Sequence, residues 1–268
     1  MTLSVLIPWC NRPVLGETLA NNARRLRKSG IEVLVVNGGG AKDQVESLIE
    51  EHGWPRIRIV HTRSRTAFNK SECLNLGVSL ARGRFVFVLD ADVILTDGFL
   101  EKAIEAIGNG DPCFASVARV IESDPDTRPE RWNPESAILQ RVFSTKLTTP
   151  AGITATVEYR TTRNGTRTGP GLVVVSRRHF IAVQGFNSNL KGWGYEDYDF
   201  QLRLQLLLGL KRRTFGRVLH LSHRGVVRRG SDYRNRNECF RNYGHGLFLG
   251  TYHADVRRLK DHAVEVMI

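Results

Sequence analysis

The sequence has little that would set it apart from an ordinary globular protein. Its longest uninterrupted apolar run is Phe85–Leu89, far short of the roughly 20 residues that a membrane-spanning helix needs. Its first eight residues have neither the basic start nor the apolar stretch of a secretory signal. The four cysteines are too widely spaced for a CxxC zinc or redox pair, and no disulfide framework is indicated. These absences predict a reducing, cytoplasmic setting.

Positive charge is in excess, and it is unevenly distributed. The 268 residues are 41% hydrophobic and 25% charged, which excludes a disordered, collagen-like or coiled-coil chain, and the formal net charge is +12. Residues 1–150 contain 19 Lys and Arg against 18 Asp and Glu, whereas residues 151–268 contain 20 against 9. This imbalance indicates an anionic partner for the second half, such as nucleic acid, glycan, phospholipid or nucleotide. An arginine-rich composition that serves solubility is the alternative.

Strands alternate with helices over the first third of the chain. Buried strands are predicted at residues 4–8, 31–36, 57–61 and 84–89, and helices at residues 15–28, 42–52 and 71–81. Such alternation predicts crossover connections and a mostly parallel sheet flanked by helices, in an α/β domain. Nucleotides bind these sheets beyond the carboxyl ends of the strands.

The second half has weaker periodicity. Residues 122–150 are rich in Pro and Thr and are predicted to form a variable loop. Asn164-Gly165 favours a tight turn, so a hairpin is expected between strands at 154–160 and 167–176. Three further elements, an apolar helix, a strand and a basic loop, are expected at residues 199–210, 217–221 and 224–241. Because no linker-like stretch divides the chain, one domain over residues 1–268 is predicted.

Two aspartates follow the fourth predicted strand. Asp90 and Asp92 lie at positions i and i+2, an arrangement that suits a divalent cation bridging a diphosphate, because Mg²⁺ and Mn²⁺ often take only one or two carboxylates. A simple turn is the alternative for an acidic pair at a strand end. His220 and His223 follow the last predicted strand, and a neutral imidazole is a further ligand type for Mn²⁺. His220 is the stronger candidate of the two.

A second acidic group lies in the sequence GWGYEDYD, just before the apolar helix. Trp193 and Tyr195 offer flat surfaces for a sugar, the first on the donor side and the second on the acceptor side. The adjacent carboxylates of Glu196 and Asp197 can divide binding from proton abstraction. Asp199 is equally consistent with stabilising a helix start.

These motifs occur in an order that resembles the GT-A glycosyltransferases, in particular family 2, the β-1,4-galactosyltransferases and chondroitin-polymerase-like enzymes. The matching segments run from residue 3 to residue 223 and are SVLIPWCNR, FNKSECLNLG, FVFVLDAD, GWGYEDYDF and RVLHLSH. The resemblance implies a GT-A fold in which residues 1–95 bind a nucleotide sugar and residues 96–268 bind the acceptor. It also implies an inverting hexosyl transfer to a hydroxyl from a UDP-sugar, with Mn²⁺ or Mg²⁺ as cofactor.

The resemblance carries roles over to individual residues. Asp197 corresponds to the catalytic base and Glu196 to a donor or acceptor contact, while Asp92, Asp90 and His220 correspond to the metal ligands. The implied donor contacts are Pro8, Asn11, Arg12, Asn37, Phe68, Asn69, Lys70, Asp90 and Trp193.

Two of these positions depart from the family pattern. Asn37 stands where the family usually has an Asp that recognises the nucleotide base. Lys70 keeps the charge of the galactosyltransferase Arg without its planar, bidentate fork.

The arginines of the second half indicate a polyanionic acceptor. The predicted hairpin carries Arg160, Arg163 and Arg167, and the basic loop carries Arg228 and Arg229 with aromatic residues interleaved. This composition suits phosphate contacts and stacking, and it favours a hydroxylated base in DNA. A surface polysaccharide or a lipid-linked glycan at a membrane surface is the alternative acceptor.

Two other function classes compete. A non-catalytic nucleic-acid-binding module would account for the charge but not for the ordered motifs. A nucleotidyltransferase would place a glycine-rich phosphate loop after the first strand, where this chain has PWCNR.

Overall fold

The protein is described by a computed structural model that covers residues 2–54, 56–62, 68–96, 98–124, 137–192, 194–223 and 231–268. Its strands are β1 (Leu3–Trp9), β2 (Ile31–Asn37), β3 (Ile57–His61), β4 (Phe85–Val88), β5 (Val93–Leu95), β6 (Cys113–Glu122), β7 (Gln140–Thr148), β8 (Thr154–Thr162), β9 (Thr166–Ser176), β10 (Lys211–His220) and β11 (Val264–Met267). Its helices are α1 (Leu15–Leu26), α2 (Lys42–Glu50), α3 (Lys70–Leu80), α4 (Phe99–Gly108), α5 (Arg177–Ala182), α6 (Glu196–Leu208), α7 (Ser231–Gly244) and α8 (Tyr252–Leu259).

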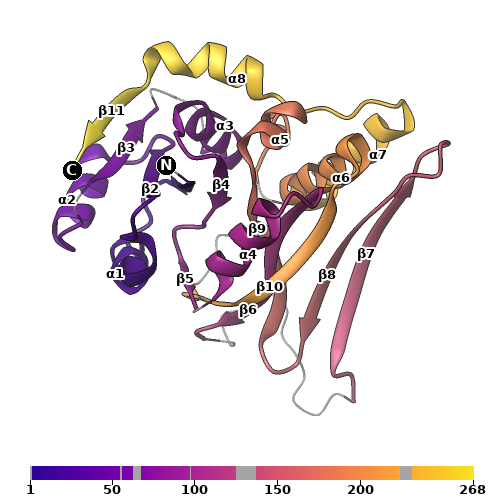
Figure 1. Ribbon diagram of the computed structural model, residues 1–268, viewed down its shortest axis with the longest axis horizontal. Helices are drawn as coiled ribbons and strands as arrows, with labels where there is room; N and C mark the ends of the chain where they lie inside the picture. Colours follow the sequence, from indigo (N-terminus) through magenta and orange to yellow (C-terminus); the bar gives the residue numbers. More distant parts are fainter. Residues whose placement is uncertain are drawn as a thin grey trace.

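These strands form one sheet (Figure 1). Its order is β11-β3-β2-β1-β4-β9-β6-β10-β5, and β8 pairs with β9 and β7 with β8. Strands β3, β2, β1 and β4 run parallel, as do β6 and β10, whereas the other ladders are antiparallel. The predicted α/β fold is confirmed. The sheet is mixed rather than mostly parallel, because β9 enters antiparallel between β4 and β6.

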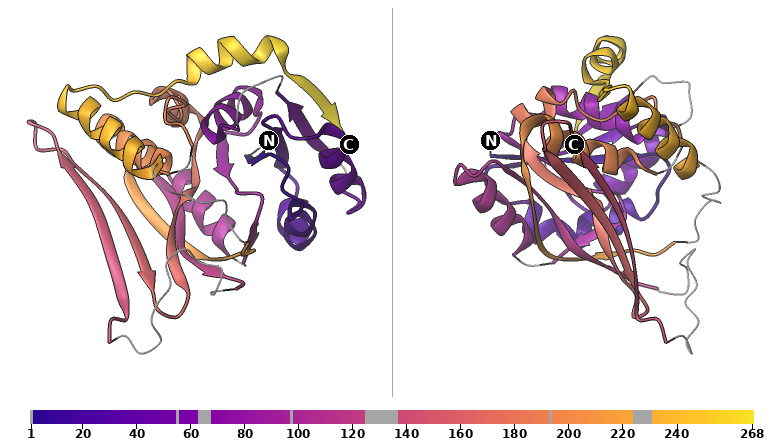
Figure 2. Two further views of the ribbon diagram at one scale, coloured as in Figure 1. Left: turned by 180° about the vertical axis from the view of Figure 1, so that it is seen from behind. Right: turned by 90° about the vertical axis from the view of Figure 1, so that its right-hand side faces the viewer.

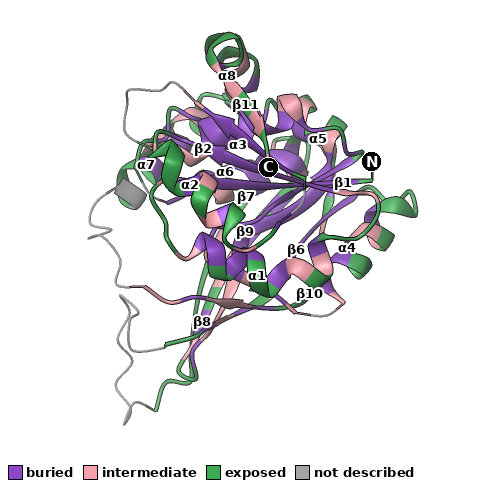
Figure 3. Cartoon of the chain, turned by 90° about the vertical axis from the view of Figure 1, so that its left-hand side faces the viewer, coloured by how far each residue is buried: buried purple, intermediate pink, exposed green. Residues whose placement is uncertain are grey.

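Apolar side chains cover both faces of the sheet. Strand alternation divides β1 between them, with Val5 and Ile7 in one cluster and Leu6 in the other. Helices α1, α2 and α4 pack on the first face, and α3, α5 and α6 pack on the second. Figure 3 shows the central strands buried beneath helices whose outer faces are exposed. Within the described ranges, no helix is long and apolar enough to cross a membrane.

The C-terminal elements return to the first half of the sheet. Helix α8 lies beside α3, and β11 pairs with β3 at the far edge (Figure 2). The β7–β8 hairpin extends away from the opposite side of the molecule, with β8 packed on α6. Helix α8 therefore returns the C-terminal end of the chain to the part of the sheet that the first residues form.

Predicted and observed elements agree best in the first ninety residues, where every boundary falls within two residues of its prediction. Two predicted loops were wrong in part: residues 140–148 form β7, and residues 231–244 form α7. Both segments are mostly polar or exposed, so neither shows a clear apolar period. The last predicted strand begins at Lys211 rather than at residue 217.

Candidate active site

The turn that carries Asp90 and Asp92 connects β4 to β5 and is fixed by α1. Thr18 donates to the carbonyl of the intervening Ala91 at 2.7 Å. Asn22 donates to the backbone beyond the turn at 2.8 Å and accepts from it at 2.8 Å. Thr18 and Asn22 are both fully buried, so these bonds hold the turn rigidly against the core.

Asp92 meets two histidines from the end of β10. Its Oδ2 lies 3.1 Å from His223 Nε2 and 3.6 Å from His220 Nε2. One ligand atom from each of the three residues lies within 4.8 Å of the others. Asp90, predicted as a further metal ligand, lies outside this cluster, and its Oδ1 is 2.9 Å from Lys70 Nζ. The structure therefore brings together Asp92, His220 and His223 in place of the predicted Asp90, Asp92 and His220.

Glu122, at the end of β6, orients the His220 ring. His220 Nδ1 lies 2.6 Å from Glu122 Oε2, which directs Nε2 toward Asp92. Glu122 also accepts from Ser222 Oγ at 3.0 Å and from Arg167 Nε at 2.8 Å. Arg167, predicted as an acceptor contact, thus forms an ion pair with the residue behind the cluster.

Charge interactions dominate this cluster despite its burial. Burial opposes a charged imidazole, but hydrogen bonds to Asp92 and Glu122 outweigh it and raise the pKa of His220 to about 9. Burial also opposes the charged carboxylates, yet the bonds from His220 and His223 hold the pKa of Asp92 well below its ordinary value. His220 and Arg167 likewise lower the pKa of Glu122 to about 2 against the effect of burial. Both carboxylates are therefore ionised at neutral pH.

The two histidines differ in how well they fit a metal. Because Glu122 accepts from His220 Nδ1, the lone pair of a neutral His220 ring lies on Nε2 and faces Asp92. Arg12 Nη1 lies 3.3 Å from His223 Nδ1, and a guanidinium can only donate. A neutral His223 therefore carries its proton on Nε2, so His220 is the better ligand in this arrangement.

We expect Glu122→Gln to weaken Mn²⁺ binding by about 10–100-fold, the usual effect of losing a carboxylate that orients a metal-ligating histidine. Titration calorimetry with Mn²⁺ alone measures this without any turnover assay. Glu158→Gln is the matched control, because Glu158 is half-buried on β8 and pairs with Arg160, away from the histidines. Equal Mn²⁺ affinity in the two variants would contradict the orienting role of Glu122.

A second group of charges lies where α3 and α6 begin. Lys70 Nζ is 2.9 Å from Asp90 Oδ1 and 3.6 Å from Asp197 Oδ1. Asp197 Oδ1 is buried and has no hydrogen-bond partner within the described part of the chain. Its other oxygen faces Gly171 on β9, where an added Cβ would lie 2.5 Å from Oδ2. Only a glycine leaves room for this carboxylate.

Burial dominates the protonation of the adjacent carboxyl groups. Burial, reinforced by the charge of Asp197, raises the pKa of Glu196 to about 8. Burial also raises the pKa of Asp197, although Lys70 opposes this shift. Burial alone would lower the pKa of Lys70, but Asp197 and Asp90 outweigh it and raise that pKa. At neutral pH, Lys70 is charged and Glu196 is mostly protonated.

We expect Lys70→Gln to move the acidic limb of the kcat/KM profile to higher pH. The substitution removes the positive charge that lowers the pKa of Asp197, so a base at this position would need a higher pH to lose its proton. Nucleotide release measured across pH checks this shift. Lys191→Gln is the control, because Lys191 is 70% exposed and its ion pair, with Glu72, does not involve Asp197. An unchanged limb in Lys70→Gln would contradict the electrostatic role.

Several predicted donor contacts have structural partners. Pro8 is buried within β1, and Asn11 adopts a left-handed backbone (φ 50°) while its side chain accepts from Ala41 N at 2.8 Å. Asn37 is 2% exposed, and its amide bonds to both backbone groups of Gly40 at 2.7 and 2.9 Å. A direct contact between Asn37 and a nucleotide base would require this turn to open.

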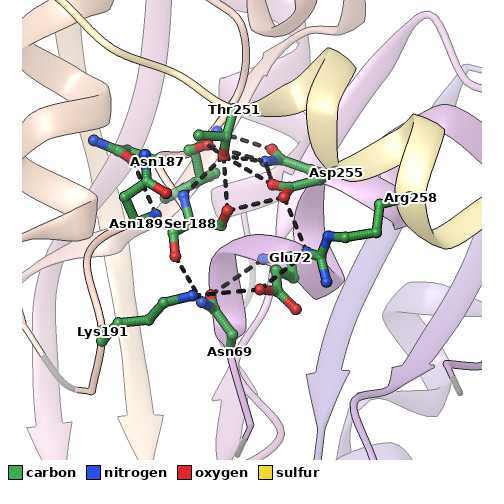
Figure 4. Close-up of polar contacts among 11 residues, drawn as sticks. Asn69, Glu72, Asn187, Ser188, Asn189, Lys191, Thr251, Asp255 and Arg258 are labelled. Atoms are coloured by element: carbon green, nitrogen blue, oxygen red, sulfur yellow. Dashed lines mark hydrogen bonds and ion pairs between the residues drawn. The ribbon is translucent and has the colours of Figure 1, made fainter. Parts of the chain in front are cut away.

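Phe68 and Asn69 border a cavity of about 510 Å³ beside the start of α3. Phe68 is 41% exposed, whereas Asn69 caps α3 by accepting from Glu72 N and donates to Ser188 O at 2.9 Å. Buried Asp255 lines the same cavity and accepts from four side chains, which are Asn75, Ser188, Thr251 and Arg258. The last three lie around Asp255 in Figure 4. These bonds tie the segment before α6 to α8.

Two residues of the GWGYEDYD segment have their partners inside the protein. Tyr195, predicted to contact the acceptor, is 6% exposed, and its ring stacks on Tyr198 with centroids 5.4 Å apart. Asp199 is fully paired inside the protein, with Arg203 at 2.8 Å and the Tyr243 hydroxyl at 2.7 Å. Asp199 therefore contributes an ion pair within α6 and a hydrogen bond to α7.

Of the remaining predicted residues, two are described by the structure and three are not. Arg160 pairs with Glu158 at 2.9 Å, and the Arg163 backbone bonds to Leu139 O at 3.0 Å beside the turn of the β8–β9 hairpin. Three predicted contacts lie outside the described residues, namely Trp193, Arg228 and Arg229.

Sequence reasoning missed Glu122 and Gly171. Glu122 ends β6, a strand that the sequence analysis did not predict, and only the pairing of β6 with β10 places it beside His220. Gly171 carries no sequence signal either, because its importance depends on a contact with a residue 26 positions away.

Comparison with known proteins decides the family. Residues 4–164, more than half of the chain, match glycosyl transferase family 2. The chain belongs to this family. Residues 153–224 of this family-2 glycosyltransferase also match a family described as the N-terminal domain of galactosyltransferase. The glycosyltransferase resemblance of the sequence motifs is thereby confirmed, whereas the role of the GWGYED segment stays a prediction.

A curated protein and two solved structures are similar to this chain at low sequence identity. The Drosophila melanogaster protein named "Putative polypeptide N-acetylgalactosaminyltransferase 13" is 24% identical over an alignment of 221 positions, which covers 77% of this chain and 39% of that protein. S. aureus TarS 1-349 in complex with UDP-GlcNAc superimposes with a TM-score of 0.59 at 14% identity, covering 85% of this chain and 60% of the TarS 1-349 chain.

A mannosyltransferase from Pyrobaculum calidifontis, PcManGT, in complex with GDP-Man and Mn²⁺, superimposes with a TM-score of 0.52 at 20% identity. The match covers 81% of this chain and 56% of that one. These two structures share the GT-A fold with the present chain. The chain spans about two fifths to three fifths of the lengths of these relatives.

Proposed function

We propose that this protein transfers a sugar from a nucleotide sugar to an acceptor hydroxyl, with Asp197 as the base and a divalent ion bound at Asp92 and His220. One observation carries the proposal. Lys70 Nζ contacts both Asp90, in the turn that carries Asp92, and Asp197, at the start of α6. The acidic turn and the candidate base therefore belong to one site.

The residues around Asp92 fit a divalent cation. They offer one carboxylate and the imidazole of His220, with His223 available once Arg12 leaves its Nδ1. Mixed nitrogen and oxygen donors suit Mn²⁺ better than Mg²⁺, which prefers oxygen ligands. A bound ion supplies positive charge that stabilises the leaving diphosphate. The Mn²⁺ complex of PcManGT supports this choice of metal.

Asp197 has the properties of a general base for an acceptor hydroxyl. Its buried Oδ1 has no hydrogen-bond partner in the described structure, and Lys70 lies 3.6 Å away, close enough to favour its ionised form. A hydroxyl that enters this position donates to Oδ1 and loses its proton as it attacks. One base on the acceptor side, with direct displacement, gives inversion at the anomeric carbon.

The donor and acceptor follow from weaker observations. The UDP-GlcNAc bound to TarS supports a UDP-sugar as the donor of this protein. The GDP-Man bound to PcManGT makes a GDP-sugar the second donor to test. The excess of arginine in residues 151–268 supports an anionic acceptor. A hydroxylated base in DNA is the acceptor we propose, and a surface polysaccharide or lipid-linked glycan is the alternative.

Nucleotide release tests the proposal. The protein is incubated with UDP-GlcNAc, UDP-glucose, UDP-galactose or GDP-mannose and Mn²⁺, each with hydroxymethylated DNA, glycans or lipid-linked sugars. We expect one donor to release nucleotide faster when the correct acceptor is added. An absence of release from every donor, by protein that binds none of the nucleotides, would contradict the transferase function.

A further inference from the structure

A second cavity, separate from the predicted donor contacts, lies among β6, β8, β9 and β10. Its volume is about 460 Å³, within the ~300–1,000 Å³ typical of ligand pockets. Four arginines line it, together with a single carboxylate from Glu158. The arginines are Arg119, Arg160, Arg167 and Arg212. We call this cavity the arginine groove.

Two of the four arginines are already paired. Arg160 Nη2 lies 2.9 Å from Glu158 Oε1, and Arg167 Nε lies 2.8 Å from Glu122 Oε1. Neither Arg119 nor Arg212 contacts a carboxylate of the described residues. The groove therefore holds more positive charge than its own acidic residues neutralise.

Arg212 is the most informative of these side chains. It is partly buried, and its Nε donates to the hydroxyl of Ser116 at 2.9 Å, which fixes the guanidinium in place. Burial lowers the pKa of Arg212, and Tyr198 and Glu158 offset this only partly from a distance. Buried charges are usually paired, because the loss of hydration is costly unless an opposite charge compensates it. A fixed and partly dehydrated guanidinium without a contacting carboxylate is suited to an anionic ligand.

The groove adjoins the site of transfer. Arg167 lines the groove and bonds to Glu122, which in turn bonds to His220 of the metal cluster. Tyr198, whose charge interaction raises the pKa of Arg212, follows Asp197 directly in the sequence of α6. None of the predicted donor contacts lines the groove, so its occupant belongs to the acceptor rather than to the nucleotide sugar.

We propose that the arginine groove binds a compact anionic group of the acceptor, of the size and chemistry of a phosphate ester. Guanidinium groups present several donors in a planar fork, which matches phosphate oxygens. A pocket of about 460 Å³ has room for one such group, which a backbone phosphate of DNA and the phosphate of a lipid-linked glycan would both supply. This assignment rests on the proposed transferase function, because it makes the bound group part of the acceptor.

Binding of inorganic phosphate to the full chain tests the groove directly. We expect Arg212→Gln and Arg119→Gln each to weaken phosphate binding at least tenfold in titration calorimetry. Arg213→Gln is the matched control: Arg213 is the next residue on β10, its side chain points to the opposite face of the strand, and it is exposed beside Asp111 at 3.5 Å. Circular dichroism confirms that the variants are folded, and Arg212→Lys, which keeps the charge, is expected to retain part of the affinity.

The outcomes are distinguishable from those of the transferase test. Equal phosphate affinity in Arg212→Gln and Arg213→Gln would overturn the groove assignment, whatever the activity. Failure of the wild-type protein to bind UDP or GDP would overturn the proposed function and leave an Arg212-dependent phosphate site standing. A single-stranded oligonucleotide that binds through Arg212, with no measurable binding of phosphate, would replace the compact group by an extended nucleic acid.

Discussion

Asp197→Asn is expected to lower kcat by about 10²–10⁴-fold, the usual contribution of a general base. The amide has nearly the size of the carboxylate, so it fits the space beside Gly171 where no larger group is accommodated. It cannot take a proton from the acceptor hydroxyl. Because the carboxylate faces the acceptor in this mechanism, the affinity for the nucleotide sugar should change little, and calorimetric titration with the nucleotide measures that separately.

Glu196→Gln is the control for this result. The pKa of Glu196 is raised to about 8, so its carboxyl is mostly protonated at pH 7 and a glutamine resembles that neutral form. We therefore expect Glu196→Gln to keep much of the activity at pH 7. If Glu196→Gln were inactive and Asp197→Asn active, the roles of the two residues would be reversed.

Removal of divalent ions is expected to abolish turnover, and added Mn²⁺ should restore it more fully than Mg²⁺. The reason is the donor set, in which the imidazole of His220 accompanies the carboxylate of Asp92. Asp92→Ala and His220→Ala should each remain inactive at Mn²⁺ concentrations that saturate the wild-type protein. Nucleotide release with and without EDTA, followed by titration of each metal, gives the measurement.

Asp90→Asn provides the comparison for the metal variants. Asp90 lies outside the cluster and pairs with Lys70, so its loss should leave Mn²⁺ affinity much closer to that of the wild-type protein than the loss of Asp92 does. Full activity in EDTA would contradict both the metal site and its role in the reaction.

The sequence predicts best those features that local patterns determine. The alternating strands and helices of the first ninety residues, the hairpin around Asn164-Gly165 and the position of Asp92 after a buried strand all depend on neighbouring residues. Each of these predictions agrees with the observed position in the fold. Short-range periodicity and turn chemistry are enough to place them.

The partners of individual side chains could not be predicted in the same way. Tyr195, Asn37 and Arg167 have the residue types expected of ligand contacts, yet each bonds or packs within the protein. Each also has a partner on a distant strand: Thr145 on β7 for Tyr195, His61 on β3 for Asn37 and Glu122 on β6 for Arg167. Composition alone could not distinguish a ligand contact from such a structural one. Glu122 was missed for the same reason, because its role depends on the pairing of β6 with β10, which places it beside His220.

The contact between Gly171 and Asp197 makes the candidate base sensitive to a residue that has no side chain. A methyl group at position 171 would lie 2.5 Å from Asp197 Oδ2, and the short carboxylate could only rotate away from its place beside Lys70. Selection for activity should therefore hold this position to glycine although its backbone is ordinary extended strand. Gly171→Ala would keep every ionisable group of the site and would still displace the base. Such a variant suits the capture of a complex that holds donor and acceptor together.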